Sequence, residues 1–362
     1  MKYYKVKYKV AGTPHWLDGL HDYKGIAHNI AIGQSIGNPN VRSEIENSKN
    51  VKEFQALVDD VDYVEKTVTI KFPLEAFTWP NISQLLCIIQ GGQSDIGEVK
   101  QCRVIDIEGL PYMNKPVLGL KEFKERVGAE NRPLLGSIIK PKSGLNAKQL
   151  ETIVEQMIDG GTDFIKEDEI LADNDYLPII ERVKVISKLI EQKKSKVVYS
   201  YCINADPFEL GNNLRAVKEG GGDCVHINFW SGLGAYTSSN AAGLITHYQR
   251  SGIRILTDKT NNYSISWPVL AKLGVMAGID TMHVGMIGGY YPADEVAETK
   301  EVVDMLVKHN RTPALSCGMT PEIAQEIRNE IGNDWMANVG GYLHSGESIY
   351  HQVKGFRDSL NG

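Results

Sequence analysis

From about residue 116 onward, the chain alternates short apolar runs with amphipathic stretches, and this rhythm limits the possible folds more than any other feature. The runs have the length of buried parallel strands, and the stretches between them have the apolar spacing of helices. The eight candidate strands lie within residues 136–142, 162–169, 197–204, 223–229, 253–258, 280–285, 313–316 and 335–340. Helical stretches include 146–159, 175–193, 292–308 and 320–329. Eight such repeats in about 245 residues predict a closed (β/α)₈, or TIM, barrel. An open doubly wound sheet is the alternative, because a strand count does not prove closure.

The first 115 residues follow a different pattern. Two-residue alternation predicts strands and helix-like spacing predicts helices, which together indicate a small ferredoxin-like α+β domain. The expected strands are 2–10, 61–72 and 98–108, and the expected helices are 21–32 and 80–90. We therefore expect two domains, an N-terminal α+β domain over 1–115 and a catalytic α/β barrel over 116–362.

Charge and cysteine content exclude several classes of protein. The net charge is −6 over 362 residues, with acids and bases interspersed, so a nucleic-acid partner is not expected. The five cysteines form no C-x-x-C pair, which argues against a disulfide framework and a zinc site. No apolar run is long enough to cross a membrane. We expect a cytoplasmic protein with reduced thiols and no membrane partner.

Polar residues stand where nearly every candidate barrel strand ends, and that is where barrel enzymes place their catalytic groups. One such residue has about even odds of being an ordinary rim residue, but together they would form a ring. They are Lys140, Lys142, Lys166, Asp168, Glu169, Asn204, His226, Asn228, Asp258, Lys259, His283, Ser316, Asn338, Gly340 and Gly341.

The densest group of charges is the run Lys166-Glu167-Asp168-Glu169, which follows the apolar run TDFI. Asp168 and Glu169 offer the hard oxygen ligands that Mg²⁺ prefers, whereas an ammonium group on Lys166 would repel a cation. Considered alone, such a run is more typical of a solvated surface turn.

Two segments change that interpretation. GSIIKPKSGL and GGTDFIKEDE resemble signature segments of the RuBisCO superfamily, and the similarity continues through YCINADP, VLAKLGVMAGIDTMHVG, PALSCG and NVGG. The chain looks like a RuBisCO-like protein of the form IV type. The resemblance implies that CO₂ converts Lys166 to a carbamate, which would bind Mg²⁺ together with Asp168 and Glu169.

The same resemblance assigns further roles. Lys140 would move protons at the substrate enolate with Lys142 beside it, and His283 would act at the end of strand six. Arg250 and Ser316 match substrate-binding residues. After strands seven and eight, Ser316, Gly318, Gly340 and Gly341 stand where such barrels hold a phosphate on backbone N–H groups. The segment IAIGQSIGN is similar to a family element that reaches into a partner's site, which implies a homodimer or higher homo-oligomer.

Some family positions differ. The carboxylases have a lysine in the loop after strand six, and Tyr290 stands at that position. In the partner-contributed segment, Gly33 replaces a glutamate, and Asn38 and Pro39 replace a Thr-Trp pair. Gly92 falls where the carboxylases have an asparagine and the methionine-salvage enolases have a lysine. Groups that would stabilise a developing carboxylate are missing, so carboxylation is not expected.

We therefore expect a lyase or isomerase that forms a metal-stabilised enolate or enediolate from a phosphorylated ketose or keto acid, by isomerase, enolase or decarboxylase chemistry. One alternative is the 2,3-diketo-5-methylthiopentyl-1-phosphate enolase of methionine salvage. Another is a non-catalytic sugar-phosphate-binding homologue.

Overall fold

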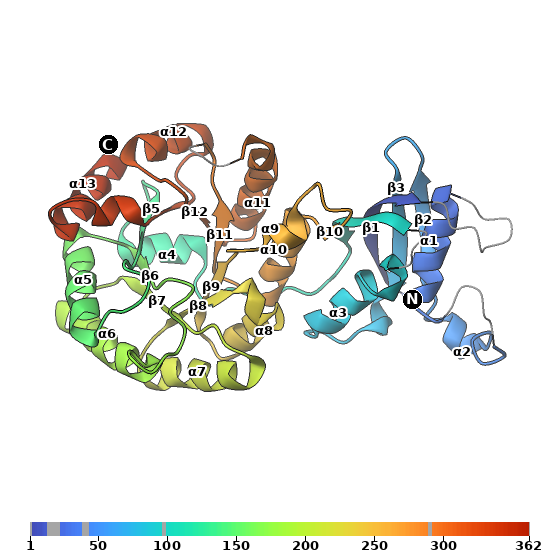
Figure 1. The fold of residues 1–362 in the computed structure, drawn as a ribbon, viewed down its shortest axis with the longest axis horizontal. Helices are drawn as coiled ribbons and strands as arrows, with labels where there is room; N and C mark the ends of the chain where they lie inside the picture. Colours follow the sequence, from blue (N-terminus) through green and yellow to red (C-terminus); the bar gives the residue numbers. More distant parts are fainter. Residues whose placement is uncertain (1, 13–21, 38–42, 96–98, 289–291, 362) are drawn as a thin grey trace. The chain divides into compact units, whose positions relative to one another are not determined.

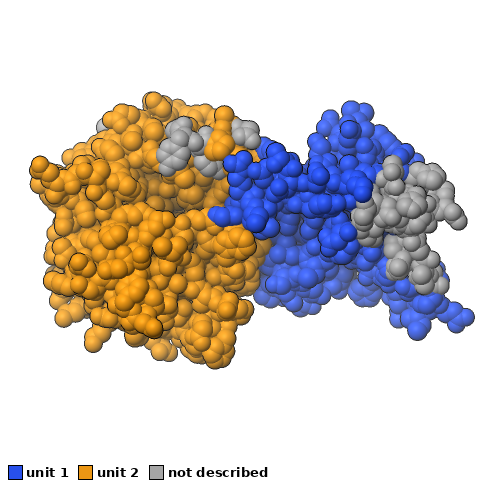
Figure 2. All heavy atoms as spheres, in the orientation of Figure 1, with its two compact units in different colours: residues 1–112, 252–273 blue, residues 113–251, 274–362 orange. Residues whose placement is uncertain are grey.

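The structure is a computed structural model that describes residues 2–12, 22–37, 43–95, 99–288 and 292–361 (Figure 1). The chain divides into two compact units, Met1–Tyr112 with Gly252–Leu273, and Met113–Ser251 with Gly274–Gly362 (Figure 2). The segment Gly252–Leu273 joins the first unit because its strand β10 (Tyr263–Ile265) pairs with β4 (Val99–Glu108). The sequence pattern had placed this segment within the barrel domain.

The first unit has the βαββαβ order of a ferredoxin-like domain, as predicted. Besides β4 and β10, the unit contains β1 (Tyr3–Gly12), α1 (Asp22–Gly33), α2 (Lys49–Lys52), β2 (Leu57–Asp62), β3 (Thr67–Pro73) and α3 (Ile82–Ile89). The sheet order is β10-β4-β1-β3-β2, and β1 pairs antiparallel with both neighbours. Alternate residues of β1 are fully buried, which explains the two-residue period in the sequence. The single strand expected over 61–72 is in fact the end of β2, a turn and β3.

The second unit contains a closed barrel of eight parallel strands, so the barrel prediction is confirmed (Figure 1). Its strands are β5 (Leu134–Ile138), β6 (Phe164–Lys166), β7 (Val198–Cys202), β8 (Cys224–Asn228), β9 (Ile245–Gln249), β11 (Thr281–Gly285), β12 (Thr312–Leu315) and β13 (Met336–Val339). The main helices that follow them are α5 (Ala147–Gly160), α6 (Ile179–Lys193), α7 (Pro207–Glu219), α8 (Gly234–Ala241), α10 (Trp267–Ala277), α11 (Val296–Lys308), α12 (Pro321–Ile331) and α13 (Ile349–Asn361).

The fifth barrel strand was predicted wrongly. It is β9, whereas residues 253–258 contain the short helix α9 (Arg254–Thr257) and belong to the first unit. The sequence of β9, ITHYQ, has polar side chains that face the barrel interior, so it has a weaker apolar signal than the run that follows it. Asp258 and Lys259 are therefore not barrel-rim residues, and Asp258 instead pairs with Arg254 at 2.8 Å.

One end of the barrel is filled by the helix that precedes the first strand. From α4 (Leu120–Val127), Leu120 and Phe123 pack onto the first inward-facing residues of the strands, and Phe123 meets Phe164 with ring centroids 6.3 Å apart. These strand residues include Leu134, Phe164, Val198, Cys224, Ile245, Ala314 and Met336. Apolar packing closes the N-terminal end of the barrel, so a polar site has to form at the carboxyl ends of the strands.

Charged residues at the N-terminal ends of the strands are bonded to one another and to the backbone. Arg132 donates two hydrogen bonds to the Asp163 carboxylate, at 2.6 and 2.8 Å, and Arg357 lies 3.3 Å from the same group. Asp163 also accepts the Leu135 N–H at 2.8 Å. We call Arg132, Asp163 and Arg357 the Asp163 cluster. It ties the starts of β5 and β6 to α13.

Asp280 occupies an equivalent position just before β11. Its carboxylate accepts the N–H groups of Leu118 at 2.6 Å and Thr246 at 2.8 Å. Burial raises the pKa of Asp280 to about 7, and these bonds and the nearby Arg311 only partly oppose that rise.

The sequence also predicts reduced cysteines and no membrane-spanning segment. All five cysteines are free, and Cys102, Cys202 and Cys224 are buried. Within the ranges that the structure describes, no helix combines the length and the apolar character that a membrane span requires.

Candidate active site

A pocket of about 540 Å³ opens at the carboxyl ends of the barrel strands. It gathers side chains from segments that are far apart in the sequence but end at the same rim. The predicted site residues that line it are Lys140, Lys142, Lys166, Asp168, Glu169, His283, Ser316, Gly318, Gly340 and Gly341. Arg250 lies behind the wall, between the lining residues Gln249 and Ser251.

Lys166 is the last residue of β6, and its side chain is 1% exposed at the base of the pocket. Its Nζ donates to the Glu167 carbonyl oxygen at 3.1 Å and lies 3.6 Å from Glu169 Oε2. Burial lowers the pKa of Lys166, and the charges of Glu169 and Asp168 only partly oppose this effect. A larger fraction of the amine is therefore neutral, and the neutral amine is the nucleophilic form.

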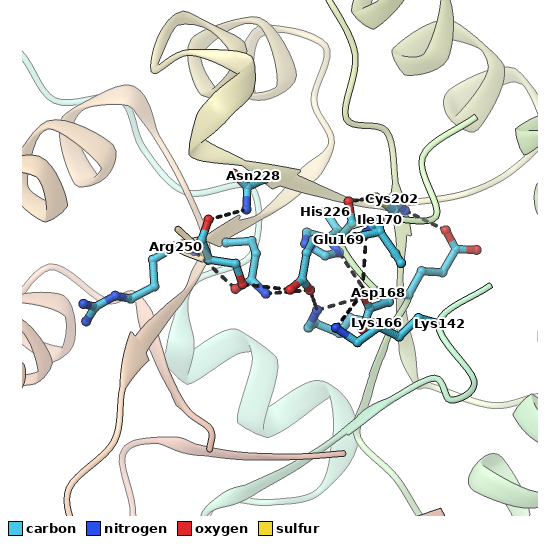
Figure 3. A network of polar contacts seen from close by, with 12 residues as sticks. Lys142, Lys166, Asp168, Glu169, Ile170, Cys202, His226, Asn228 and Arg250 are labelled. Carbon is cyan, nitrogen blue, oxygen red and sulfur yellow. Dashed lines mark hydrogen bonds and ion pairs between the residues drawn. The ribbon is translucent and has the colours of Figure 1, made fainter. Parts of the chain in front are cut away.

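Asp168 follows two residues later, so the strand alternation brings it to the same side as Lys166. Its carboxylate is nearly buried and accepts Lys140 Nζ at 2.6 Å, while Lys142 Nζ lies 3.7 Å away. Both lysines come from the segment after β5. Figure 3 shows Lys142, Lys166 and Asp168 directed toward one another.

Glu169 is held by two neutral donors that follow or end β9. Gln249 Nε2 donates to Oε2 at 3.0 Å, and Ser251 Oγ donates to Oε1 at 2.8 Å. Burial alone would raise the pKa of Glu169, but the Lys166 charge and these hydrogen bonds outweigh it and bring the pKa to about 2. The site therefore holds Glu169 as a carboxylate in a fixed orientation. We call Lys166, Asp168 and Glu169 the Lys166 cluster.

Glu167, in the middle of the charged run, is fully buried and has different partners. It accepts hydrogen bonds from Arg182 Nε at 3.0 Å, Tyr199 Oη at 3.0 Å and the Cys202 N–H at 2.7 Å. Arg182 also donates to the carbonyl groups of Ala172 and Leu177, each at 2.6 Å. This buried pair fixes the loop after β6 against α6 and β7. The run is therefore not the solvated turn that its charges alone would indicate.

Three residues of the expected rim ring support the loops around the pocket. Asn204 Nδ2 donates to the Glu169 carbonyl at 2.7 Å, and the Asn228 N–H donates to Asn204 Oδ1 at 2.6 Å. His226 Nδ1 lies 3.0 Å from the Glu167 carbonyl oxygen. These contacts hold the backbone that carries the Lys166 cluster.

Another part of the pocket lining is rich in glycine. Gly318, Gly340 and Gly341 line it beside Ser316, and a Cβ added to Gly341 would meet no atom within 4 Å. The short helix η5 (Gly341–His344) begins there, and His344 Nε2 lies 3.0 Å from the Ile138 carbonyl oxygen. Glycines leave N–H groups accessible from the pocket, which suits a phosphate.

His283 lines the same pocket near the end of β11, with its Nδ1 buried and without a hydrogen-bond partner within the described ranges. Burial, followed by the Arg250 and Lys166 charges, lowers the pKa of His283 to about 3. The imidazole is therefore neutral near pH 7. It can accept or donate one hydrogen bond to a substrate hydroxyl.

Residues that the sequence did not single out also line the pocket. Gln249 and Ser251 are the most important of these, because both donate hydrogen bonds to Glu169. Cys317, Met319, Thr320 and Tyr342 complete the wall after β12 and β13. Ser251 stands two residues after β9, and because the sequence pattern did not identify β9 as a strand, it did not mark Ser251 as a site residue.

The donor atoms of the Lys166 cluster decide whether it can hold a metal ion. Within the described ranges, no group of three or more His, Cys, Asp or Glu side chains is placed to hold a metal ion. Asp168 and Glu169 supply two carboxylates, and the buried Lys166 amine lies 3.6 Å from Glu169 Oε2. The set fits Mg²⁺ on one condition, that Lys166 carries an additional anionic oxygen.

The sequence is similar to those of two enzymes that act on phosphorylated compounds. Over 63% of its length the chain is 34% identical to 3-oxo-isoapionate-4-phosphate decarboxylase of Rhizobium rhizogenes, and the match spans 57% of that relative. It is 28% identical to 2,3-diketo-5-methylthiopentyl-1-phosphate enolase of Bacillus cytotoxicus, covering 90% of this chain and 85% of that one.

Solved structures share the fold. Octameric Rubisco from Pyrococcus horikoshii matches with a TM-score of 0.85 at 23% identity, covering 99% of this chain and 88% of the other. A rubisco-like protein from Burkholderia fungorum matches with a TM-score of 0.81 at 22% identity, covering 100% and 94%.

Two family models match the chain. The ribulose bisphosphate carboxylase large chain N-terminal domain covers residues 18–113, and the catalytic domain of the same family covers residues 119–332. Of the expected departures, Asn38, Pro39 and Tyr290 lie outside the described residues. The family models, the barrel and the conserved order of its segments lead to one conclusion, that this chain belongs to the RuBisCO large-chain family.

Proposed function

We propose that this chain is a Mg²⁺-dependent RuBisCO-like enzyme that forms an enediolate from a phosphorylated ketose or keto acid and does not carboxylate ribulose bisphosphate. The observation that carries the proposal is the single pocket in which the Lys166 cluster, Lys140 and His283 face a glycine-lined wall. A proton-moving group, a candidate metal site and a phosphate anchor thus border one space.

Lys166, Asp168 and Glu169 would hold the Mg²⁺. The neutral amine of Lys166 would add to CO₂ and release one proton, which gives a carbamate and supplies the anionic oxygen that the cluster needs. When bound, Mg²⁺ would polarise the substrate carbonyl and stabilise negative charge on its oxygen. Gln249 and Ser251 keep Glu169 oriented for this role.

The other pocket residues bind the substrate and move its protons. Lys140 Nζ is held by Asp168 at the pocket edge, and from there it would take or return the proton on the carbon next to the carbonyl. His283 would orient a substrate hydroxyl as a neutral imidazole. The backbone at Gly318, Gly340 and Gly341 would hold one phosphate, with Ser316 beside it.

The proposed reaction class has two supports, the intermediate that the candidate reactions share and the names of two relatives. Decarboxylation of a β-keto acid phosphate, enolisation and isomerisation share an enediolate or enolate intermediate. The names of the two relatives above, a decarboxylase and an enolase, support a lyase-type reaction on a monophosphate. Methionine-salvage enolase chemistry remains the second candidate, although Gly92 provides no lysine. A binding protein without turnover would not need the Lys166 cluster.

Carboxylation lacks support in the described N-terminal unit as well. At Gly33, where the carboxylases have a glutamate, an added Cβ would lie 2.2 Å from the Gln93 side chain. The residue that the family uses there therefore does not fit without a shift of Gln93.

A panel of keto-sugar phosphates and β-keto acid phosphates tests the proposal. With Mg²⁺ and bicarbonate, at least one member should release CO₂ or exchange a carbon-bound proton with deuterated solvent, and chelator should stop the reaction. Labelled bicarbonate with ribulose bisphosphate should give no acid-stable product. Steady incorporation of label, or turnover that survives excess chelator, would contradict the proposal.

The proposal includes a cytoplasmic homodimer or higher homo-oligomer. Its support is that a related archaeal Rubisco is described as dimeric and the Pyrococcus horikoshii protein as octameric. Light scattering at micromolar concentration should give at least twice the 40.2 kDa chain mass, and a monomer would count against this part.

A further inference from the structure

Arg250 is a nearly buried guanidinium directly behind the pocket wall, and its place in the structure differs from that of the other site residues. Its Nη1 donates to the Val284 carbonyl at 2.6 Å, and its Nη2 lies 3.4 Å from Glu295 Oε2. Figure 3 shows the Arg250 side chain extending away from Lys142 and Asp168. The carbonyl that it binds belongs to Val284, which follows the pocket-lining His283, so the guanidinium lies next to the strand end that carries this part of the wall.

The charge of Arg250 affects the pKa values of two residues that line the pocket. It is the second cause, after burial, of the lowered pKa of His283, and it opposes the burial that raises the pKa of Cys317. Both residues line the pocket at the ends of β11 and β12. A guanidinium close to this wall would attract a second phosphate on any substrate that reached it, because its planar N–H groups match phosphate oxygens.

Glu295 forms an ion pair with Arg250 and would compete with an anionic ligand for it. It is the N-cap of α11, but its side chain makes no capping hydrogen bond to that helix. An acidic side chain at a helix start usually serves the helix itself. Here the Glu295 carboxylate, 18% exposed, reaches back to Arg250 instead.

We propose that Glu295 is a specificity-determining residue, which by pairing with Arg250 makes the pocket reject substrates that carry a second phosphate. The proposal rests on the proposed function in one respect, that the pocket takes a phosphorylated substrate. A bisphosphate would have to separate Arg250 from Glu295 and place its own dianion beside the released carboxylate. A monophosphate held at the glycine-lined wall meets neither cost.

The experiment compares ribulose 1-phosphate with ribulose 1,5-bisphosphate by titration calorimetry, with Mg²⁺ and bicarbonate present. In Glu295→Gln, affinity for the bisphosphate should rise at least about tenfold relative to the monophosphate, since a charged hydrogen bond is worth that much or more. Glu326→Gln is the matched control, because it removes the same charge from an exposed position on α12. It should leave the ratio of the two affinities unchanged.

A double variant, Glu295→Gln with Arg250→Met, tests whether the gain passes through the guanidinium. It should return the bisphosphate affinity to the wild-type level, while circular dichroism shows the fold retained. The proposal is overturned if Glu295→Gln gives no selective gain, if Glu326→Gln gives the same gain, or if the gain survives in the double variant.

Failure of the proposed function has a separate signature. A wild-type protein that turns over no keto phosphate, but gains bisphosphate affinity on Glu295→Gln, would contradict the enzyme proposal and support the role of Glu295. Turnover of a monophosphate with no selective gain in the variant would do the reverse.

Discussion

The two ends of the barrel use the same types of charged residue in opposite ways. At the N-terminal end, Asp163 and Arg132 are almost fully buried and Arg357 is 23% exposed, and the Asp163 carboxylate is matched by both arginines and a backbone N–H. At the carboxyl end, Lys140 and Lys142 are 28% and 51% exposed and share one carboxylate, Asp168. Charges that are already satisfied stabilise the fold, whereas charges left facing a pocket are available for a ligand.

Removing the central amine of the pocket should give the largest effect. Lys166→Met keeps the side-chain volume but leaves the Lys166 cluster without an amine to carbamylate, so Mg²⁺-dependent turnover should fall by about a thousandfold or more. The unfolding free energy should not decrease, because an ammonium that is costly to bury has been removed. Steady-state assays and urea unfolding would measure the two effects. Activity within tenfold of wild type would remove Lys166 from the mechanism.

The reverse outcome is expected at the other end of the barrel. Asp163→Asn leaves Arg132 and Arg357 partly unpaired in a buried setting, so the unfolding free energy should fall by about 3–5 kcal/mol. The remaining folded protein should keep turnover near the wild-type level. Asp159→Asn is the control, because its exposed pair with Lys193 should contribute less than about 1 kcal/mol. Equal losses in the two variants would show that burial does not distinguish these pairs.

A smaller effect is expected from the neutral groups that hold Glu169. Gln249→Leu should weaken Mg²⁺ affinity by about tenfold, with the melting temperature little changed, because supporting hydrogen bonds to metal ligands typically contribute that much. Ser251→Ala should act in the same direction. Calorimetric titration of Mg²⁺ at fixed bicarbonate measures both. An unchanged affinity in the two single variants would mean that Glu169 does not need these donors.

The last effect requires no substitution and concerns pH and Asp280. Its folded pKa of about 7 is above the unfolded value of 3.8, so the folded state binds more protons between these values. Stability should therefore fall as pH rises through this window, by at most about 1.4 kcal/mol per pH unit, and level off above pH 7. Urea unfolding from pH 5 to 8 should show this slope in the wild type and a flatter one in Asp280→Asn. Parallel slopes would assign the pH dependence to other groups.

The sequence predicts the fold well because a parallel barrel buries its strands on both faces. Seven of the eight expected barrel strands overlap observed ones, and each observed strand is buried throughout, except for His283 in β11. The miss at β9 has a physical cause. Polar side chains such as His247 and Gln249 point into the barrel interior, and apolar content alone cannot separate an inward polar residue from a surface residue.

The sequence predicts the site residues that follow directly from the end of one strand. It does not predict the contacts that depend on how the ends of different strands are aligned across the barrel. Lys166 and Asp168 follow from the end of one strand and its alternation. The bonds from Gln249 and Ser251 to Glu169 require knowing that the end of β9 meets the end of β6 across the barrel mouth. The Glu167–Arg182 pair was also missed, because Arg182 lies 15 residues away on α6 and the sequence alone does not place its guanidinium beside Glu167.

The apolar packing of α4 against the inner strand residues closes the N-terminal end of the barrel, so the pocket opens at the carboxyl ends of the strands. A molecule that enters at the carboxyl ends of the strands cannot pass through to the other end of the barrel, so on the proposed function the product would leave from the side at which the substrate entered. Lys166 lies at the base of the pocket, so on the proposed function CO₂ would have to reach it before a substrate covers it. In kinetic terms, product inhibition should be competitive, and preincubation with bicarbonate should remove a lag that appears when substrate is added first.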